Sequence, residues 1–266
     1  MADDWVVEIE LEGGEDPFVA AIWETRPTAV EERDRLLVAG YADQQAAREA
    51  AAWFGSSARL TRVADDSWAD AWRPHAEAVV VGDVGLVPTW CGVPDDVAIA
   101  VMIEPGRAFG AGNHPSTRLA ASWVRDLVQP GMRVLDVGTG TGVLGVLAAL
   151  NGASHVIGTD IDPAAVEVAR GNARRNDVAD RFVVTDAPVS ELPMDFDLVV
   201  ANILPGALRS MADELVLRCA PGGQIVLSGM LVRDVNGLVD AFAADEADRR
   251  ELDDWAAPLL TPRPTG

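Results

Sequence analysis

The residues best suited to chemistry in this 266-residue sequence are three alternating glycines that follow a short apolar run. Residues 133–137 lead into Gly138, Gly140 and Gly142, a pattern that predicts a buried strand, a tight turn and the start of a helix. Because glycine lacks a β-carbon, the backbone can contact a ligand there, and the helix offers unsatisfied N–H groups and the positive end of its dipole. The turn therefore predicts a cofactor site, with a ligand-free turn as the simpler alternative.

Two kinds of cofactor fit this turn. Residues 140–145 spell the G-x-G-x-x-G pattern of dinucleotide enzymes, and Asp160 lies about where their ribose-binding acid stands. Asp136, however, precedes the first turn glycine by two residues, and a carboxylate there would repel a pyrophosphate. The same carboxylate suits the ammonium and sulfonium charges of S-adenosylmethionine. We therefore expect S-adenosylmethionine, with a nicotinamide-dependent oxidoreductase as the alternative.

Side chains at the ends of the next two predicted strands complete this cofactor site. Asp160 and Gly138 are expected at the carboxyl edge of adjacent strands, where a carboxylate can accept both ribose hydroxyls while Ile161 packs on the adenine face. Asp162 is assigned to capping the helix that follows. Asp186 ends the third strand and is predicted to accept a hydrogen bond from the adenine amino group.

Polar residues at two further places point into the same predicted cleft. Asn202 ends an otherwise apolar strand, and because a buried amide is costly when unpaired, we expect it to have a partner there. A second glycine-rich stretch, residues 104–118, precedes a helix predicted over 116–127. Thr117 in the first turn of this helix is placed for a polar ligand contact, with simple capping as the alternative. His114, beside a proline, is interpreted as a turn or capping residue more than as an acid–base group.

The elements that must position these residues alternate between strand and helix from residue 133 onward, which predicts a parallel sheet in an α/β fold. A small α+β module is predicted before them, with strands over 5–11, 18–23, 35–41 and 58–63 and a helix over 43–54. We therefore divide the chain into an N-terminal domain (1–64), a linker with a tryptophan-containing helix and short strands (65–99), and a cofactor-binding domain (100–266).

Composition narrows the classes of function. The formal charge of −21 argues against a direct nucleic-acid partner, because phosphate binding needs a basic face, and it favours a basic protein partner. The basic residues are all arginines, so Schiff-base chemistry through a lysine is excluded. Cys91 and Cys219 lack metal-ligand spacing, so we expect no metal. No apolar run reaches the roughly 18 residues of a membrane span and no signal peptide is evident, which favours the cytoplasm and no membrane partner.

Taken together, these stretches resemble the methyltransferases of large-subunit ribosomal protein L11, a family of class I, S-adenosylmethionine-dependent enzymes. The resemblance covers residues 68–231, and its most specific parts are Ala-Phe-Gly-Ala-Gly-Asn-His-Pro-Ser-Thr-Arg (108–118) and Ala-Asn-Ile-Leu (201–204). It implies a Rossmann-like sheet with a ferredoxin-like N-terminal module that recognises the ribosomal protein. It also implies cofactor contacts at Thr117, Gly138, Asp160 and Asn202.

Three departures from the family pattern bear on this expectation. Pro205 stands where the family usually has alanine. The sequence pattern lacks the first helix expected between the first two N-terminal strands, so that module is expected to be reduced. The C-terminal strands are expected to be eroded over residues 249–266. The first two departures concern recognition of the substrate more than the chemistry.

The activity implied by the resemblance is trimethylation of amino groups. Asn202 would be the catalytic residue, because its amide and nearby backbone carbonyls could align a neutral amine, which can lose its proton to water before attack. Ribosomal protein L11 is the expected substrate, followed by another protein's lysine or a small-molecule amine. A nucleobase amino methylase, which places an aromatic residue after this asparagine, is a rival hypothesis, as is a non-enzymatic binding module that has kept the fold.

Overall fold

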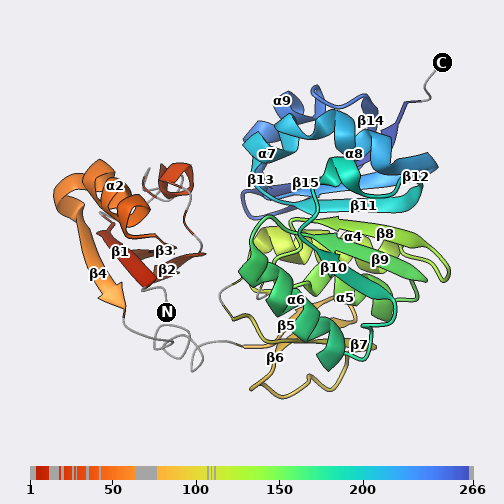
Figure 1. The fold of residues 1–266 in the computed structure, drawn as a ribbon, viewed down its shortest axis with the longest axis horizontal. Coiled ribbons are helices and arrows are strands. Elements are labelled where there is room, and N and C mark those ends of the chain that lie inside the picture. The colour runs from red at the N-terminus through yellow and green to blue at the C-terminus, as the bar shows by residue number, and fades with distance from the viewer. Residues whose placement is uncertain are drawn as a thin grey trace. The chain divides into compact units, whose positions relative to one another are not determined.

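The computed structural model describes residues 4–11, 18, 21–25, 27, 29–33, 36–41, 43–63, 77–106, 108, 110 and 112–263. The chain divides into two compact units (Figure 1). The first lies within residues 1–76, and the second takes in 77–106 and the described residues from 110 on. The domain boundaries predicted at 64 and 99 stay a prediction, and the tryptophan helix expected near 68–72 lies outside the described residues.

The first unit is a four-stranded antiparallel sheet packed against helix α2 (Gln44–Phe54). Its strands, in the order β2–β3–β1–β4, are β1 (Asp4–Glu10), β2 (Ala29–Arg33), β3 (Leu36–Tyr41) and β4 (Ala58–Val63). Asp43 caps α2 by accepting a hydrogen bond from the N–H of Ala46 at 2.9 Å, as its position ahead of the helix predicts. The predicted helix and the predicted strand at 58–63 are therefore confirmed.

The strand expected over 18–23 is wrong, because this connection between β1 and β2 is helical. Phe18 and Ala21 have helical backbone, and a 3-10 turn, η1, runs over Ile22–Thr25. Phe18 meets the Phe54 ring edge-to-face at 5.2 Å, and Ile22 is fully buried. A spacing of four residues puts both side chains on one helical face. The connection expected to lack a helix thus has one, and the order of elements is that of a ferredoxin-like module.

The second unit contains an eight-stranded mixed sheet in the order β10–β9–β8–β11–β12–β15–β13, with β14 paired to β15. The parallel strands are β8 (Arg133–Val137), β9 (His155–Thr159), β10 (Phe182–Thr185), β11 (Phe196–Asn202) and β12 (Cys219–Ser228). Strand β15 (Trp255–Pro262) is antiparallel to β12, to β13 (Met230–Leu231) and to β14 (Ala244–Leu252). The predicted α/β architecture is confirmed.

Helices cover both faces of this sheet (Figure 1). On one face, α4 (Pro115–Leu127), α5 (Val143–Leu150) and α6 (Pro163–Arg175) share a hydrophobic core, and on the other, α7 (Pro205–Ser210), α8 (Ala212–Arg218) and α9 (Val235–Val239) share a second. The sequence pattern predicts one helix over 206–219, and this prediction is wrong, because Met211 separates α7 from α8. Leu208 and Leu215, on either side of the break, both lie in the core. The sequence pattern also predicts a helix over about 234–244, whereas α9 ends at Val239, after the 3-10 turn η5 (Val232–Asp234).

The C-terminal strands are complete, so the expectation that they are eroded is wrong. Strands β14 and β15 form a long hairpin, and β15 contributes Ala256, Ala257, Leu259 and Leu260 to the two cores. The hydrophobic pattern does not predict strand β14 because most of its residues are charged. Charges of this kind protect the open edge of a sheet from pairing with other chains. The hypothesis of a non-enzymatic binding module thereby loses the feature that favoured it.

A smaller sheet consists of β5 (Val79–Val81), β6 (Val84–Pro88) and β7 (Ile99–Ile103), close to the strand-like apolar runs over 78–81, 85–87 and 97–103 in the sequence. It packs on the same core as α4 and α5. In the described part of the chain, no helix is long and apolar enough to cross a membrane.

Candidate active site

The alternating glycines form the turn between β8 and α5, where their spacing predicts it. Gly138, Gly140 and Gly142 have φ values of 68°, 54° and 81°, which glycine adopts at little cost. A β-carbon on Gly138 would lie 2.1 Å from Cγ2 of Ile203. Because Ile203 follows Asn202 at the end of β11, the missing side chain lets the ends of β8 and β11 approach each other.

Asp136 is buried inside this turn. Its Oδ2 accepts hydrogen bonds from Thr139 Oγ1 at 2.6 Å and from the Gly145 N–H at 3.0 Å, so it ties the turn to the first part of α5. Burial raises the pKa of Asp136 to about 6; the two hydrogen bonds oppose this shift and the charge of Asp160 adds to it. The carboxylate therefore braces the turn, and a direct contact between Asp136 and a cofactor stays a prediction.

Asp160 follows β9 and is joined to the glycine turn. Its Oδ2 accepts a hydrogen bond from the Gly140 N–H at 2.9 Å, and its Oδ1 accepts one from the Asp162 N–H at 3.0 Å. Each carboxylate oxygen has a second lone pair, so both can still accept a hydroxyl. Asp162 caps α6 by accepting the Ala164 N–H at 2.8 Å, which confirms its predicted role.

Two exposed side chains lie beyond Asp160. Ile161 is 96% exposed, an unusual position for a large apolar side chain. Asp186 is also exposed and follows β10, the strand paired with β9. The Asp160 N–H donates to the Thr185 carbonyl at 3.2 Å, so the two acidic residues end neighbouring strands. The roles predicted for these side chains toward adenine stay predictions.

Asn202 and Thr117, which stand 85 positions apart, meet at the end of β11. The Asn202 Nδ2 donates a hydrogen bond to Thr117 Oγ1 at 3.3 Å. The Asn202 Oδ1 is buried and has no hydrogen-bond partner among the residues that the structure describes. An orphaned buried amide oxygen costs free energy, so its retention at a strand end points to a ligand. Thr117 is fully buried and is therefore placed to orient the amide.

His114 caps α4. Its Nδ1 accepts a hydrogen bond from the Ser116 N–H at 3.2 Å and lies 2.7 Å from Ser116 Oγ. Its ring packs edge-on against Trp255 at 4.4 Å. Burial lowers the pKa of His114 to about 4, so the ring is neutral at physiological pH. This geometry favours the capping interpretation over acid–base chemistry.

The sequence pattern did not predict that Ile203 packs closely against two glycines. A β-carbon on Gly229, which follows β12, would lie 2.5 Å from the Ile203 carbonyl oxygen. Together with Gly138, this glycine leaves room for the backbone that carries Asn202. The signal available in the sequence was a lone glycine directly after a strand, which often marks a close approach of backbones.

The described residues contain no group of three histidine, cysteine or acidic side chains that could hold a metal ion. Cys219 is a free thiol. Burial raises the pKa of Cys219 to about 12, with the charge of Asp197 adding to the effect. Cys219 therefore provides no reactive thiolate at neutral pH.

The sheet order separates this fold from that of the dinucleotide-binding enzymes. Their parallel strands run in the order 3-2-1-4-5-6, whereas here the antiparallel β15 lies beside β12. The crystal structure of ribosomal protein L11 methylase from Lactobacillus delbrueckii subsp. bulgaricus aligns with a TM-score of 0.64 at 26% identity. The alignment covers 71% of this chain and 100% of that one.

Sequence comparisons agree with this structural likeness. Ribosomal protein L11 methyltransferases of Burkholderia multivorans and Syntrophotalea carbinolica are 41% and 43% identical over 200 and 205 residues. Each match covers 74% of this chain and 65% or 67% of the relative, so the chain spans about two thirds of the relatives' length. The family model described as Ribosomal protein L11 methyltransferase (PrmA) matches residues 19–257. The chain therefore belongs to the ribosomal protein L11 methyltransferase family.

Proposed function

We propose that this chain transfers methyl groups from S-adenosylmethionine to amino groups of ribosomal protein L11. The observation that carries the proposal is the orphaned Oδ1 of Asn202 at the carboxyl end of the parallel sheet. Ligands of open α/β sheets bind at this edge. An amide oxygen accepts hydrogen bonds, so it suits the N–H of a substrate amine.

The residues around the glycine turn fit S-adenosylmethionine. Asp160 keeps lone pairs for the ribose hydroxyls, and the exposed Ile161 offers an apolar surface for the adenine. Gly138 and Gly140 keep the turn free of side chains. When bound, the cofactor supplies an electrophilic methyl group on its sulfonium.

Asn202 and Thr117 would position the substrate. The Asn202 Oδ1 would accept a hydrogen bond from the substrate amine and so hold the lone pair of the amine toward the methyl group. Thr117 accepts a hydrogen bond from Asn202 Nδ2 and so keeps the amide oxygen directed at the amine. The neutral His114 is held as a helix cap, so the amine would lose its proton to water.

Pro205 does not stand against this proposal. It occupies the first position of α7, where a missing N–H costs nothing because that group would have no helical partner. Leu204, just before it, is 44% exposed and aliphatic. Nucleobase amino methylases stack an extruded base on an aromatic residue here, so an aliphatic side chain favours an alkyl amine.

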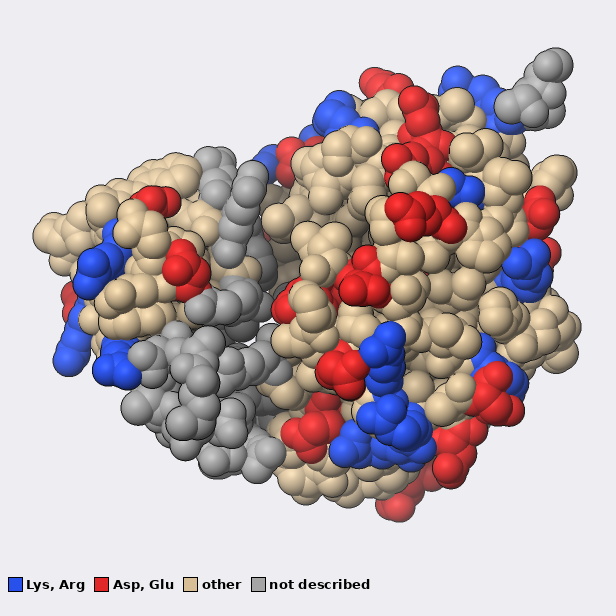
Figure 2. All heavy atoms as spheres, in the orientation of Figure 1, with Lys and Arg blue, Asp and Glu red and all other residues tan. Residues whose placement is uncertain are grey.

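Charge supports a basic protein as partner. The chain carries a formal charge of −21, and Figure 2 shows acidic and arginine side chains interspersed over the face drawn. A ribosomal substrate would place the reaction in the cytoplasm. Another protein's lysine is the next candidate, because the fold does not determine the substrate.

Transfer of labelled methyl groups tests this proposal. The purified chain would be incubated with labelled S-adenosylmethionine and either ribosomal protein L11 or total RNA. Because the chain contains no lysine, any methyl-lysine must come from the substrate. We expect label in L11. Label in RNA would reverse the choice of substrate, and binding of NADH without binding of S-adenosylhomocysteine in a calorimetric titration would contradict the choice of cofactor.

A further inference from the structure

The second unit has a groove of about 440 Å³ beside α4. Its walls come from β5 and the turn after it, from the first half of α4, and from the end of β14. Successive helix residues point about 100° apart, so Thr117 reaches Asn202 while Arg118 lines the groove. The groove and the proposed transfer site therefore both use residues from the first turn of α4.

Arg118 brings an unpaired positive charge to this groove. Its Nε is buried and has no hydrogen-bond partner, and its side chain has no hydrogen bond or ion pair within the described part of the chain. Guanidinium groups removed from water are normally paired with a carboxylate or phosphate. In a chain with twice as many acidic as basic residues, a partly buried arginine without an acid is unusual.

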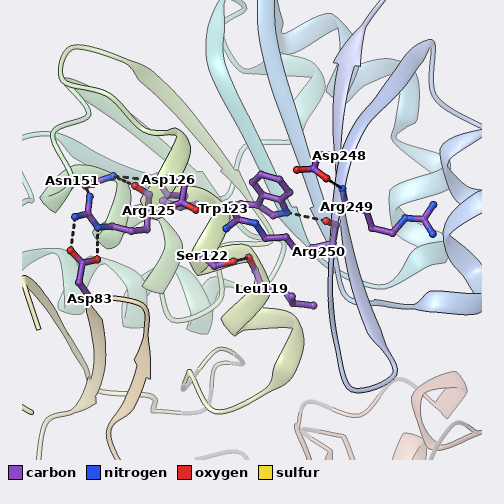
Figure 3. A network of polar contacts seen from close by, with 12 residues as sticks. Asp83, Leu119, Ser122, Trp123, Arg125, Asp126, Asn151, Asp248, Arg249 and Arg250 are labelled. Atoms are coloured by element: carbon purple, nitrogen blue, oxygen red, sulfur yellow. Dashed lines mark hydrogen bonds and ion pairs between the residues drawn. The ribbon is translucent and has the colours of Figure 1, made fainter. Parts of the chain in front are cut away.

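The other arginine of the groove is already occupied. Arg250 extends from β14 over the Trp123 ring at 3.7 Å and donates from Nη2 to Asp126 Oδ2 at 2.6 Å, as Figure 3 shows. Trp123 is itself fixed by a hydrogen bond from its Nε1 to the Ala257 carbonyl at 2.9 Å. This wall is thus rigid, and Arg118 remains the group available to a ligand.

The wall formed by β5 is held in the same way. Asp83, in the turn after β5, accepts hydrogen bonds from Nε and Nη2 of Arg125 on α4 at 2.7 and 2.6 Å (Figure 3). This bidentate pair fixes the distance between the two walls. The pKa of Asp83 is lowered, mainly by its hydrogen bond to Arg125, so the pair stays charged.

The remaining lining is apolar apart from Glu251 and the hydroxyl of Ser122, which donates to the Leu119 carbonyl at 2.7 Å. Val80 is 45% exposed, and Leu119 and Leu252 also line the groove. Glu251 alternates with Arg250 along β14, so the two side chains point to opposite faces, and its carboxylate lies 3.8 Å from Arg249 Nη1. A ligand would therefore meet one unpaired cation between aliphatic side chains.

We propose that this groove binds an acidic side chain of the protein substrate, together with a neighbouring apolar residue. The inference rests on the proposed function, which puts a protein segment at Asn202. Among the described strands, β5 is at the edge of its sheet and β14 pairs with β15 alone, so both offer an open edge to an extended segment. The carboxylate would pair with Arg118, and its apolar neighbour would contact Val80 and Leu252.

The test compares Arg118→Met with Arg174→Met, a control that removes an exposed arginine from α6 of the same unit. Steady-state transfer to ribosomal protein L11 is measured at varied L11. We expect Arg118→Met to raise KM for L11 by about 10- to 100-fold, the usual effect of a charged hydrogen bond, with kcat nearly unchanged. Arg118→Lys is expected to recover part of the loss. A KM for Arg118→Met within about twofold of wild type would overturn the inference.

Two further measurements separate the possible failures. Affinity for S-adenosylhomocysteine, measured by calorimetry, should be the same in wild type and Arg118→Met, which shows that the variant is folded. If the variant does not fold, the substrate is changed instead: each aspartate of L11 is replaced by asparagine and each glutamate by glutamine, one at a time. With the wild-type enzyme, one of these L11 variants should then show a KM raised by about 10- to 100-fold. No effect at any position would overturn the inference. Absence of transfer by wild type would contradict the proposed function itself.

Discussion

The proposed chemistry depends on the side-chain amide of Asn202. Its nitrogen donates a hydrogen bond to Thr117, and its buried oxygen is left for the substrate. Asn202→Ala removes the acceptor, so we expect kcat to fall about 100-fold or more. Thr117→Val keeps the shape but releases the amide, with an expected loss of about tenfold. Ser210→Ala, an exposed position on α7, is the control. Single-turnover rates and affinity for S-adenosylhomocysteine would be measured, and unchanged turnover in Asn202→Ala would contradict the assignment.

Asp136 makes stability depend on pH in an unusual direction. Its folded-state pKa of about 6 lies above the ordinary 3.8, so between these values the folded chain holds a proton that the unfolded chain has released. The stability contributed by this group is present at low pH and is lost as the pH rises through 6. The difference corresponds to about 3 kcal/mol.

Asp136→Asn should remove this dependence, because its amide cannot titrate. We expect the free energy of unfolding of the variant, relative to wild type, to rise by about 1.4 kcal/mol between about pH 5 and pH 7.5, because part of the difference is already lost between pH 3.8 and pH 5. Urea titrations of both proteins without cofactor measure it, and taking the difference cancels the titration of other groups. A difference that stays constant with pH would show that the Asp136 pKa is ordinary.

Single residues show what spacing can and cannot predict. Asn202, Asp160 and Asp162 are found where strand ends and helix starts place them, because position along a strand decides which sheet edge a residue occupies. The burial of Asp136 could not be read from spacing, since it depends on hydrogen bonds from Thr139 and Gly145 that form only when the turn closes.

At the scale of elements, the site depends on how closely β8 and β11 approach. Gly138→Ala would place a β-carbon 2.1 Å from Ile203 Cγ2 at a φ of 68°. We expect a loss of about 3 kcal/mol or more in the free energy of unfolding. Adding Ile203→Ala should recover the part due to the clash but not the backbone strain. Denaturant unfolding measures both.

Gly171→Ala is the matched control for this experiment. Gly171 lies in α6, and a β-carbon there would meet nothing within 4 Å. The substitution should stabilise the chain by about 0.5–1 kcal/mol, because alanine favours the helix more than glycine. An unchanged unfolding midpoint in Gly138→Ala would contradict the close approach of the two strand ends.

Two physical reasons explain why the sequence pattern predicted some elements wrongly. The segment over 18–25 is short and apolar, and periodicity alone does not separate a buried strand from a buried helical turn. Strand β14 is mostly charged because its edge is open, so its pairing with β15 becomes visible only in three dimensions. In contrast, the central parallel strands β8, β9 and β11 are buried on both faces, and their apolar runs are unmistakable.

At the scale of the whole molecule, the net charge of −21 should govern encounter with a basic substrate. Raising the salt from about 0.1 M to about 1 M shortens the Debye length from about 10 Å to about 3 Å. We expect KM for L11 to rise steeply over this range, with kcat and the affinity for S-adenosylhomocysteine changing little. A KM independent of salt would mean that long-range charge plays no part in recognition.

The most direct test of the central claim is the mass of ribosomal protein L11 isolated from cells with and without this chain. We predict that L11 from cells that lack the chain is lighter by whole methyl groups, and that wild-type protein but not Asn202→Ala restores the mass. An identical mass in both cells, from a chain that still binds S-adenosylmethionine, would contradict the claim that L11 is the substrate.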